Sequence, residues 1–277
     1  MELVAFPTPA AFAEMARAWL AEAERDNNLI LSVLLGAVRR GDSQSRAWLV
    51  TEAGAPLLAL WQSPPHYLAL SQGSAKAAQW AAERLEADLP GVFGTGPVAD
   101  AFAARRAECR RHATPLNGEM TFYTLERLQP FDRPRGWLRR AHPDEFPALV
   151  PLAAAAARDM NLPLPEQRPV EVERGLRRAI AEGKQFVWAE ASTVCAMASY
   201  VEALPGAGAR IRGVYTPAEL RGRGYGTAVT GALAELLLEE GQAWVSLFAD
   251  NANPTSTGIY RRLGFVPGTV FRSWRFE

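Results

Sequence analysis

Residues 210–241 constrain the fold more than any other part of the chain, because they read as a strand, a glycine-rich turn and a helix in succession. Within the second half of this stretch, apolar residues recur at the i, i+3, i+4, i+7 and i+8 spacing of one helix face. These residues are Val229, Ala232, Leu233, Leu236 and Leu237. Gly241 follows them, where glycine most easily forms a left-handed C-terminal cap. The pattern predicts a helix between the turn and Gly241.

The turn itself, residues 221–226, reads RGRGYG and places three glycines where the chain enters the helix. Glycine has no Cβ, so the backbone can curl tightly and approach another molecule closely. The first N–H groups of a helix have no internal partner and lie at the positive end of the helix dipole. Arg221 and Arg223 add positive charge nearby. These features together indicate a site for a phosphate or pyrophosphate.

Three known phosphate loops can be compared with this turn. The Walker A loop requires Gly-Lys followed by Ser or Thr, and the turn has no lysine. The dinucleotide fingerprint G-x-G-x-x-G is one residue longer than the turn allows, and no acidic residue stands in a matching context about twenty residues further on. The pattern R/Q-x-x-G-x-G/A is satisfied by Arg221, Gly224 and Gly226. A glycine-rich turn into an ordinary helix remains the alternative for the loop alone.

A second pattern follows after one more strand. The apolar residues 243–249 predict a strand covered on both faces, which completes a right-handed β-α-β unit. Asn253, Ser256, Tyr260 and the pair Gly264-Phe265 then follow in order. The two patterns and their separation resemble the motifs of the GNAT superfamily of N-acetyltransferases, and the resemblance covers roughly the C-terminal half of the chain.

The resemblance implies that acetyl-CoA is the acetyl donor and that its pantetheine arm lies in a gap beside the central strand, residues 210–216. The strand end would contact this arm, and the turn would surround the pyrophosphate. The expected donor-binding residues are Val214, Tyr215, Thr216, Arg221, Gly222, Arg223, Gly224, Tyr225, Gly226, Thr227, Asn253 and Ser256. Some of these residues have a simpler alternative role. The end of the strand would bind no ligand, the arginine side chains would lie in water, and Asn253 would cap the next helix.

Tyr260 is the residue that the resemblance makes the general acid for the leaving CoA thiolate. A thiol has a pKa of about 8.5 and an unperturbed tyrosine about 10, so a proton would be available at neutral pH. The alternative is a half-buried aromatic residue on an amphipathic helix. Glu190, Glu202 and Asp250 lie near the expected groove, but no pattern makes one of them the general base. The amine could also lose its proton through ordered water.

Composition narrows the classes of partner. The 277 residues include 30 basic and 30 acidic side chains, and this balance argues against nucleic acid as the main partner. The 2 cysteines and 3 histidines are scattered, so neither a disulfide framework nor a metal site is expected. The N-terminus lacks the pattern of a signal peptide, and no apolar run reaches the length of a membrane span. We therefore expect a cytoplasmic protein without a membrane partner.

Residues 128–136 are rich in proline and charge and predict a linker. The order of helices and strands is similar before and after it, so we expect an α+β fold with a mixed sheet in each of two GNAT-like domains in tandem, residues 1–127 and 137–277. Residues 70–76, LSQGSAK, stand where the first half would carry the glycine-rich turn, and they depart from its pattern. The first domain is thus expected to be degenerate, with a binding or dimerisation role and no CoA site. An unrelated α+β domain is the alternative. Residues 266–276 are expected to close the sheet of the second half.

These observations predict an N-acetyltransferase that moves an acetyl group from acetyl-CoA to a primary amine of a small molecule or peptide. A non-catalytic acyl-CoA-binding regulatory protein is the alternative. A homodimer is the expected form of any self-association. The proline-rich residues 161–169 are expected to form part of the rim of the acceptor site, and they leave the acceptor itself open.

Overall fold

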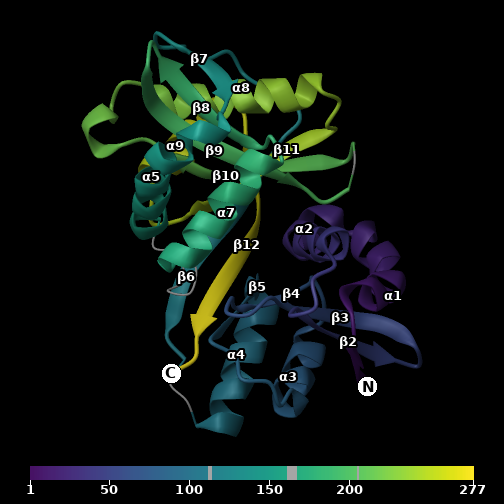
Figure 1. Cartoon of the computed structure of the whole chain (residues 1–277). Coiled ribbons are helices and arrows are strands. Elements are labelled where there is room, and N and C mark those ends of the chain that lie inside the picture. Colours follow the sequence, from purple (N-terminus) through teal and green to yellow (C-terminus); the bar gives the residue numbers. More distant parts are fainter. Residues whose placement is uncertain (112–113, 161–166, 205) are drawn as a thin grey trace. The chain divides into compact units, whose positions relative to one another are not determined.

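The computed structural model of the protein describes residues 1–111, 114–160, 167–204 and 206–277, and Figure 1 shows its ribbon. Contacts between residues group the chain into two compact units. Unit 1 comprises Met1–Met120 together with Thr269–Glu277, and unit 2 comprises Thr121–Gly268. Unit 1 is therefore discontinuous in sequence, because the C-terminal residues return to it.

The same order of elements occurs twice in the described part of the chain. The first half contains β1 (Glu2–Phe6), α1 (Pro9–Glu22), α2 (Glu24–Arg40), β2 (Arg46–Glu52), β3 (Ala55–Gln62), β4 (Leu68–Leu70), α3 (Ala75–Arg84), β5 (Gly91–Thr95), α4 (Gly96–Arg110) and β6 (Leu116–Leu125). The second half contains β7 (Trp137–Arg140), α5 (Phe146–Asp159), α7 (Pro169–Ala181), β8 (Gln185–Glu190), β9 (Thr193–Glu202), β10 (Gly208–Tyr215), α8 (Tyr225–Glu239), β11 (Trp244–Asp250), α9 (Pro254–Arg262) and β12 (Val266–Arg275). This repetition confirms the tandem α+β architecture that the sequence predicts.

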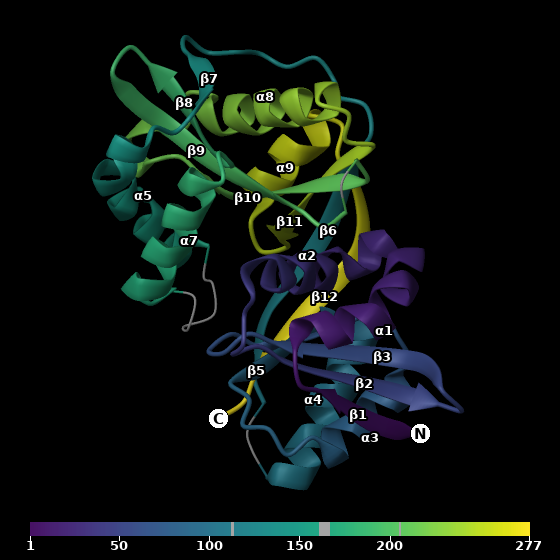
Figure 2. The same cartoon turned by 45° about the vertical axis from the view of Figure 1, so that its right-hand side comes forward.

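Unit 1 is a mixed sheet with helices on both faces. Its strands follow the order β1-β2-β3-β4-β5-β12, and β4 and β5 are the parallel pair. Helices α1 and α2 lie on one face, and α3 and α4 lie on the other, as Figures 1 and 2 both show. The core under α3 and α4 combines small helix residues such as Ala78 and Ala81 with strand residues such as Leu60 and Val92. The alanines allow the helices to approach the sheet closely.

Unit 2 has the strand order β6-β11-β10-β9-β8-β7, with β10 and β11 as its parallel pair. Helices α8 and α9 pack on one face and α5 and α7 on the other. Strand β8 shows why both faces are buried: Phe186 and Trp188 join the core under α8, while Val187 joins the core under α5 and α7. Among the described residues, no helix combines the length and apolar character required to cross a membrane.

The last strand of each half belongs largely to the unit built from the other half. The end of β6, from Thr121 onward, is part of unit 2 and lies next to β11. In β12, Phe271–Arg275 pair antiparallel with Gly91–Thr95 of β5 in unit 1. The prediction that residues 266–276 close the sheet of the second half is therefore wrong for Phe271–Arg275. An alternating pattern identifies a strand, but it does not identify the partner strand.

Side chains on both faces of β12 explain its place in unit 1. Arg272 donates a hydrogen bond from Nε to Glu119 Oε2 at 2.9 Å and also pairs with Asp100 of α4. Trp274 Nε1 donates to the same Asp100 carboxylate, at 2.9 Å from Oδ1. On the other face, the Phe271 ring stacks on Phe93 of β5, with 5.5 Å between centroids. Polar and apolar contacts thus fix the same register.

Residues 128–136 form part of unit 2, and the chain divides within β6 and β12 instead of at this predicted linker. Leu128 and Phe131 pack against the core under α8. Arg133 Nη2 lies 2.8 and 2.6 Å from the two carboxylate oxygens of Glu235 on α8. The Arg135 carbonyl accepts a hydrogen bond from Trp188 Nε1 at 3.1 Å. Proline and charge predict an extended segment correctly, but they do not reveal that its apolar residues pack, half-buried, against a core.

Replacement of Phe271 by alanine tests the place of β12. Phe271 is 2% exposed, so Phe271→Ala should lower the free energy of unfolding by about 3–5 kcal/mol. Val270 is adjacent and 36% exposed, and Val270→Ala should change it by no more than about 0.5 kcal/mol. Urea-induced unfolding followed by circular dichroism measures both. Equal stability of the two variants would contradict the observed packing of β12.

Candidate active site

Strands β10 and β11 separate at their carboxyl ends. Their parallel pairing joins Gly208–Ile211 to Trp244–Leu247, although both strands continue beyond these residues. On its other side, β10 has an irregular register with β9 between Arg212 and Tyr215, and Gly213 adopts a φ of 61° there. A bulge leaves one residue out of the ladder and increases the local twist. The end of β10 therefore carries backbone groups that can pair with an extended ligand.

The glycine-rich turn meets the end of this gap. Residues 221–224 are exposed, and Gly222 and Gly224 have φ angles of 78° and 83°, which disfavour any residue with a Cβ. A Cβ on Gly222 would have no atom within 4 Å. Helix α8 starts at Tyr225, and its N-cap residue Gly224 provides no side-chain hydrogen bond. The first N–H groups of α8 are consequently available to an anion.

Gly226 shows that the two sequence patterns form one site. A Cβ at Gly226 would lie 3.4 Å from Thr216 Oγ1 and 4.0 Å from Ile259 Cδ1. Thr216 follows β10, Gly226 belongs to the first turn of α8, and Ile259 is on α9 next to Tyr260. The strand end, the helix start and the second motif therefore converge, as the sequence predicts for a donor site.

Both arginines of the turn contact the protein. Arg221 Nε donates to the Thr216 carbonyl at 3.1 Å, and Nη2 donates to Asp159 Oδ2 at 2.6 Å. The hydrogen bond with Asp159 raises the pKa of Arg221 above its ordinary value. Arg223 Nη2 donates to the Glu219 carbonyl at 3.3 Å. Because both side chains have protein partners, the backbone N–H groups are the main candidates for binding a pyrophosphate.

In the structure, Asn253 has the alternative role of a helix cap. Its side-chain oxygen accepts a hydrogen bond from the Ser256 backbone N–H at 3.1 Å and so caps α9. Ser256 in turn lies one helical turn before Tyr260, and its hydroxyl is within hydrogen-bonding reach of the phenol. The two predicted donor-binding residues of the second motif thus stabilise the start of the helix that holds Tyr260.

Tyr260 is 8% exposed and packs in an aromatic cluster. Its ring centroid lies 6.4 Å from that of Tyr123 and 6.0 Å from that of Phe265. Burial raises the pKa of Tyr260 to about 12, against the opposing effect of the hydrogen bond with Ser256. The premise of an unperturbed tyrosine is therefore wrong: the hydroxyl is a weaker acid than the sequence suggests, and it remains protonated throughout the physiological range.

The expectation that all three carboxylates lie near the groove is wrong for Glu202, which pairs with Ala209 at the start of β10, away from the gap at the end of that strand. Glu190 Oε2 accepts a hydrogen bond from the Tyr225 hydroxyl at 2.6 Å. Glu202 forms an ion pair with Lys184 at 2.9 Å. Asp250 ends β11, the strand that borders the gap. Sequence reasoning could not separate these three residues, because their partners come from other elements.

The structure also places a residue of the predicted linker against the turn. Pro134 lies 3.9 Å from the position that a Cβ of Gly224 would occupy. Sequence reasoning missed this neighbour, because the only signal at Pro134 was the proline-rich composition that indicated a linker. The glycine-rich turn is consequently bordered by an extended segment as well as by α8.

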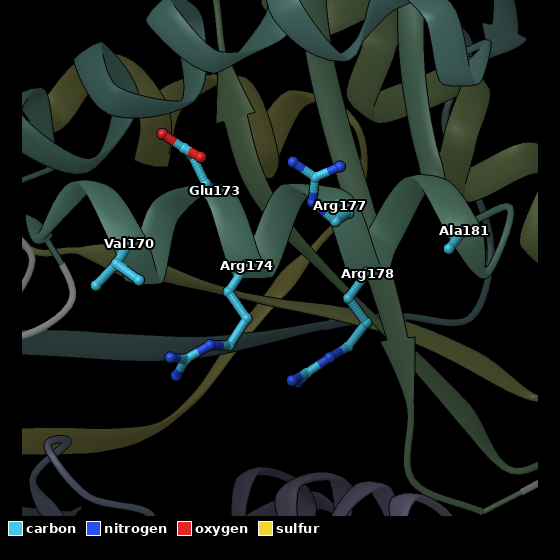
Figure 3. Close-up of a pocket in the computed structure, with 6 residues that line it drawn as sticks. All are labelled: Val170, Glu173, Arg174, Arg177, Arg178 and Ala181. Carbon is cyan, nitrogen blue, oxygen red and sulfur yellow. The ribbon is translucent and has the colours of Figure 1, made fainter.

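A separate hollow of about 430 Å³ lies along the surface of α7, as Figure 3 shows. It is lined by Val170, Glu173, Arg174, Arg177, Arg178 and Ala181. Arg174 and Arg178 point to one side of the helix, whereas Glu173 and Arg177 point to another. Arg177 lies 4.0 Å from the ring centroid of Phe146. All lining residues come from one helix, so this hollow does not enclose a ligand, and it shares no residue with the predicted site. The acceptor-site rim was predicted over residues 161–169. Of these, residues 161–166 lie outside the described residues.

Unit 1 differs from unit 2 at the helix start and strand ends that correspond to the glycine-rich turn and the gap. Helix α3 follows β4 as α8 follows β10, but Ser74 caps it by accepting a hydrogen bond from the Ala77 N–H at 3.2 Å. A Cβ on Gly94 of β5 would lie 3.0 Å from Leu70 Cβ, so β4 and β5 remain close at their ends. In its described residues, unit 1 therefore has neither the uncapped helix start nor the gap, which agrees with a first domain that lacks a CoA site. Within the described parts of the chain, no group of three or more His, Cys, Asp or Glu residues is placed to hold a metal ion.

Comparison with known proteins agrees with this geometry. Residues 152–265 match the family model described as acetyltransferase (GNAT) family. This segment contains the separated strands, the glycine-rich turn and the second motif. No curated protein matches the sequence. Residues 152–265 are thus a GNAT domain.

Solved structures resemble the whole chain in fold. A GNAT-family acetyltransferase from Colwellia psychrerythraea is 11% identical, with a TM-score of 0.63 and 100% of both chains covered. A GCN5-related N-acetyltransferase from Sphaerobacter thermophilus is 18% identical, with a TM-score of 0.62 over 99% of this chain and 95% of that one. A tandem GNAT protein from the clavulanic acid biosynthesis pathway is 17% identical, with a TM-score of 0.55 over 99% and 98%. The fold is therefore that of two GNAT domains in tandem.

Substitution of Asn253 can separate capping from a contact with the donor. Asn253→Ala removes the cap of α9 and should lower the free energy of unfolding by about 1 kcal/mol, whereas Asn253→Asp keeps a capping oxygen and should preserve stability. Chemical denaturation measures this difference. If the Asp variant binds CoA more weakly at unchanged stability, Asn253 also contacts the donor directly. Equal stability of the Ala and Asp variants would contradict the capping role.

Proposed function

We propose that the protein is an N-acetyltransferase that transfers an acetyl group from acetyl-CoA to a primary amine. The convergence at Gly226 carries this proposal, because it joins the separated strands, the uncapped helix start and α9 in one place. The GNAT family match and the fold support an acyltransferase in general. The acetyl donor and the amine acceptor are the finer steps proposed here.

Donor binding would use the backbone more than the side chains. The N–H groups of Tyr225, Gly226 and Thr227 are at the start of α8 and would donate to the pyrophosphate. The backbone groups of Val214 and Tyr215, at the bulged end of β10, would pair with the amides of the pantetheine arm as a neighbouring strand does. Such binding would fix the thioester at the end of the gap, next to α9.

In the transfer step, the amine nitrogen would attack the thioester carbonyl carbon, and the carbon–sulfur bond would break to release the CoA thiolate. The amine must lose a proton, and Asp250 or ordered water at the end of β11 is the proposed route. Tyr260 would donate a hydrogen bond, and finally a proton, to the sulfur, and the proton given up by the amine would return to the phenolate through solvent. A buried donor at low dielectric stabilises the developing thiolate strongly, which offsets the raised pKa of the phenol.

The proposal also includes the type of acceptor, the location of the protein, its partners and its self-association. The acceptor would be a small molecule or peptide, in the cytoplasm, without nucleic acid or membrane as partner, and any self-association would be a homodimer. The equal numbers of basic and acidic side chains support the absence of a nucleic acid partner. Release of free thiol from acetyl-CoA in the presence of a panel of amines tests the activity. Binding of CoA without release for any amine would favour the regulatory alternative.

Replacement of Gly224 should block the donor. Gly224→Val adds a branched side chain at a φ of 83° on the exposed turn, so CoA affinity should fall at least about 10-fold. Gly241→Val is the matched control, because Gly241 has a φ of 94° beyond the opposite end of α8 and open space around it. Calorimetric titration with CoA measures both. Unchanged affinity in a folded Gly224→Val protein would refute the placement of the pyrophosphate.

Removal of the Tyr260 hydroxyl should slow the chemical step. Tyr260→Phe keeps the packed ring, and it should lower kcat about 10²-fold with little change in CoA affinity or Tm. Since burial raises the pKa of Tyr260 to about 12, its ionisation should cause no loss of kcat in the wild type up to about pH 10. Tyr123→Phe is the control, because it removes a hydroxyl from the same cluster. Full kcat in the Tyr260 variant, with chemistry rate-limiting, would reduce Tyr260 to a packing residue.

A further inference from the structure

The glycine-rich turn raises a physical question that its family pattern leaves open: what holds its N–H groups in place. Three glycines make the backbone intrinsically flexible, and fixing each residue costs about 1–2 kcal/mol of conformational entropy. Gly222 has no neighbouring atom within 4 Å of its would-be Cβ, and Gly224 has only Pro134. No side chain of the described residues caps the start of α8. The turn must therefore be fixed by the residues at its two ends.

Tyr225 provides the fixed point on the helix side. It is the first residue of α8 and directly follows the turn, yet its side chain is buried in the core, at 6% exposure. Its hydroxyl donates a 2.6 Å hydrogen bond to Glu190 Oε2, at the end of β8. Hydrogen bonds to a carboxylate are shorter and stronger than neutral ones. On the helix side, the backbone of the turn is thus connected to the sheet through the Tyr225 side chain, as Arg221 connects it to the Thr216 carbonyl on the strand side.

The chemistry of this contact suits a permanent attachment. The hydrogen bond with Glu190 and burial raise the pKa of Tyr225 to about 12, and the Cys195 thiol contributes in the same direction. The phenol consequently remains a donor over the physiological range. Cys195 itself is 2% exposed on β9, so the hydroxyl lies between two neighbouring strands of the sheet. Rotation of the first turn of α8 would break this hydrogen bond.

We propose that Glu190 and Tyr225 are positioning residues for donor binding: their hydrogen bond holds the first N–H groups of α8 in the geometry that receives the pyrophosphate. This inference rests on the proposed function. It also assigns Glu190 a role other than general base, since its carboxylate is oriented by Tyr225. A preorganised loop binds more tightly because less entropy is lost when the ligand arrives.

The test compares Tyr225→Phe with the wild type in CoA titrations and acetyl transfer. Tyr225→Phe keeps the ring and should raise both the Kd for CoA and the KM for acetyl-CoA about 10-fold, with kcat unchanged. Tyr200→Phe is the matched control, because Tyr200 is equally buried in the same core but lies on β9 away from the turn. A merely structural role would lower the Tm of Tyr225→Phe and leave its KM, like that of the control, unchanged.

Two further comparisons make the result specific. Glu190→Gln keeps an oxygen acceptor and should retain most of the affinity, whereas Glu190→Leu should resemble Tyr225→Phe. The Tyr225→Phe/Glu190→Leu double variant should be no weaker than either single variant, because the same hydrogen bond is lost in each. S-acetylpantetheine lacks the pyrophosphate, so its use as acetyl donor should be equally efficient in wild type and Tyr225→Phe.

The outcomes separate the two proposals. A wild-type protein that fails to bind CoA overturns the proposed function and this inference with it. A wild-type protein that binds CoA, together with a Tyr225→Phe variant of equal affinity, overturns the inference alone. Additive effects in the double variant, or a loss of kcat at unchanged KM, also contradict a positioning role.

Discussion

The site depends on the limited parallel pairing of β10 and β11. The pairing joins the two strands only as far as Ile211 and Leu247, and a register shift in the ladder between β10 and β9 follows at Arg212. Beyond this point β10 is no longer paired with β11, and Arg212 and Gly213 are exposed. The gap is therefore a property of the sheet itself, before any catalytic side chain is considered.

The two halves show that the same order of elements can carry an open or a capped helix start. Both contain a parallel strand pair joined through a helix, β4-α3-β5 and β10-α8-β11. In the first half, Ser74 occupies the helix start with its own hydroxyl, and Gly94 allows Leu70 to lie within contact distance. A capping serine satisfies the same N–H groups that a phosphate would, so one side chain competes with the ligand.

The sequence predicted what depends on local pattern. Glycine spacing identified the turn at Gly224, hydrophobic periodicity identified α8, and the pair Asn253 and Tyr260 placed the second motif correctly beside the first. It failed where long-range packing decides. Phe131 is half-buried against the core under α8, although composition indicated a linker, and Phe271 pairs with a strand some 180 residues earlier in the chain. The raised pKa of Tyr260 also arises from burial, which no spacing reveals.

The strand exchange explains why a degenerate first half can be retained. Strand β6 comes from the first half, yet its Tyr123 and Leu125 belong to the core of unit 2. Tyr123 packs against the ring of Tyr260, and Leu125 lies 3.3 Å from the would-be Cβ of Gly264, in the second motif. In return, β12 supplies Phe271 to unit 1. Each half therefore completes the other's sheet, and loss of the first half would remove a wall of the cluster that holds Tyr260. The first half therefore has a structural role in the core of unit 2 that does not depend on a ligand site of its own.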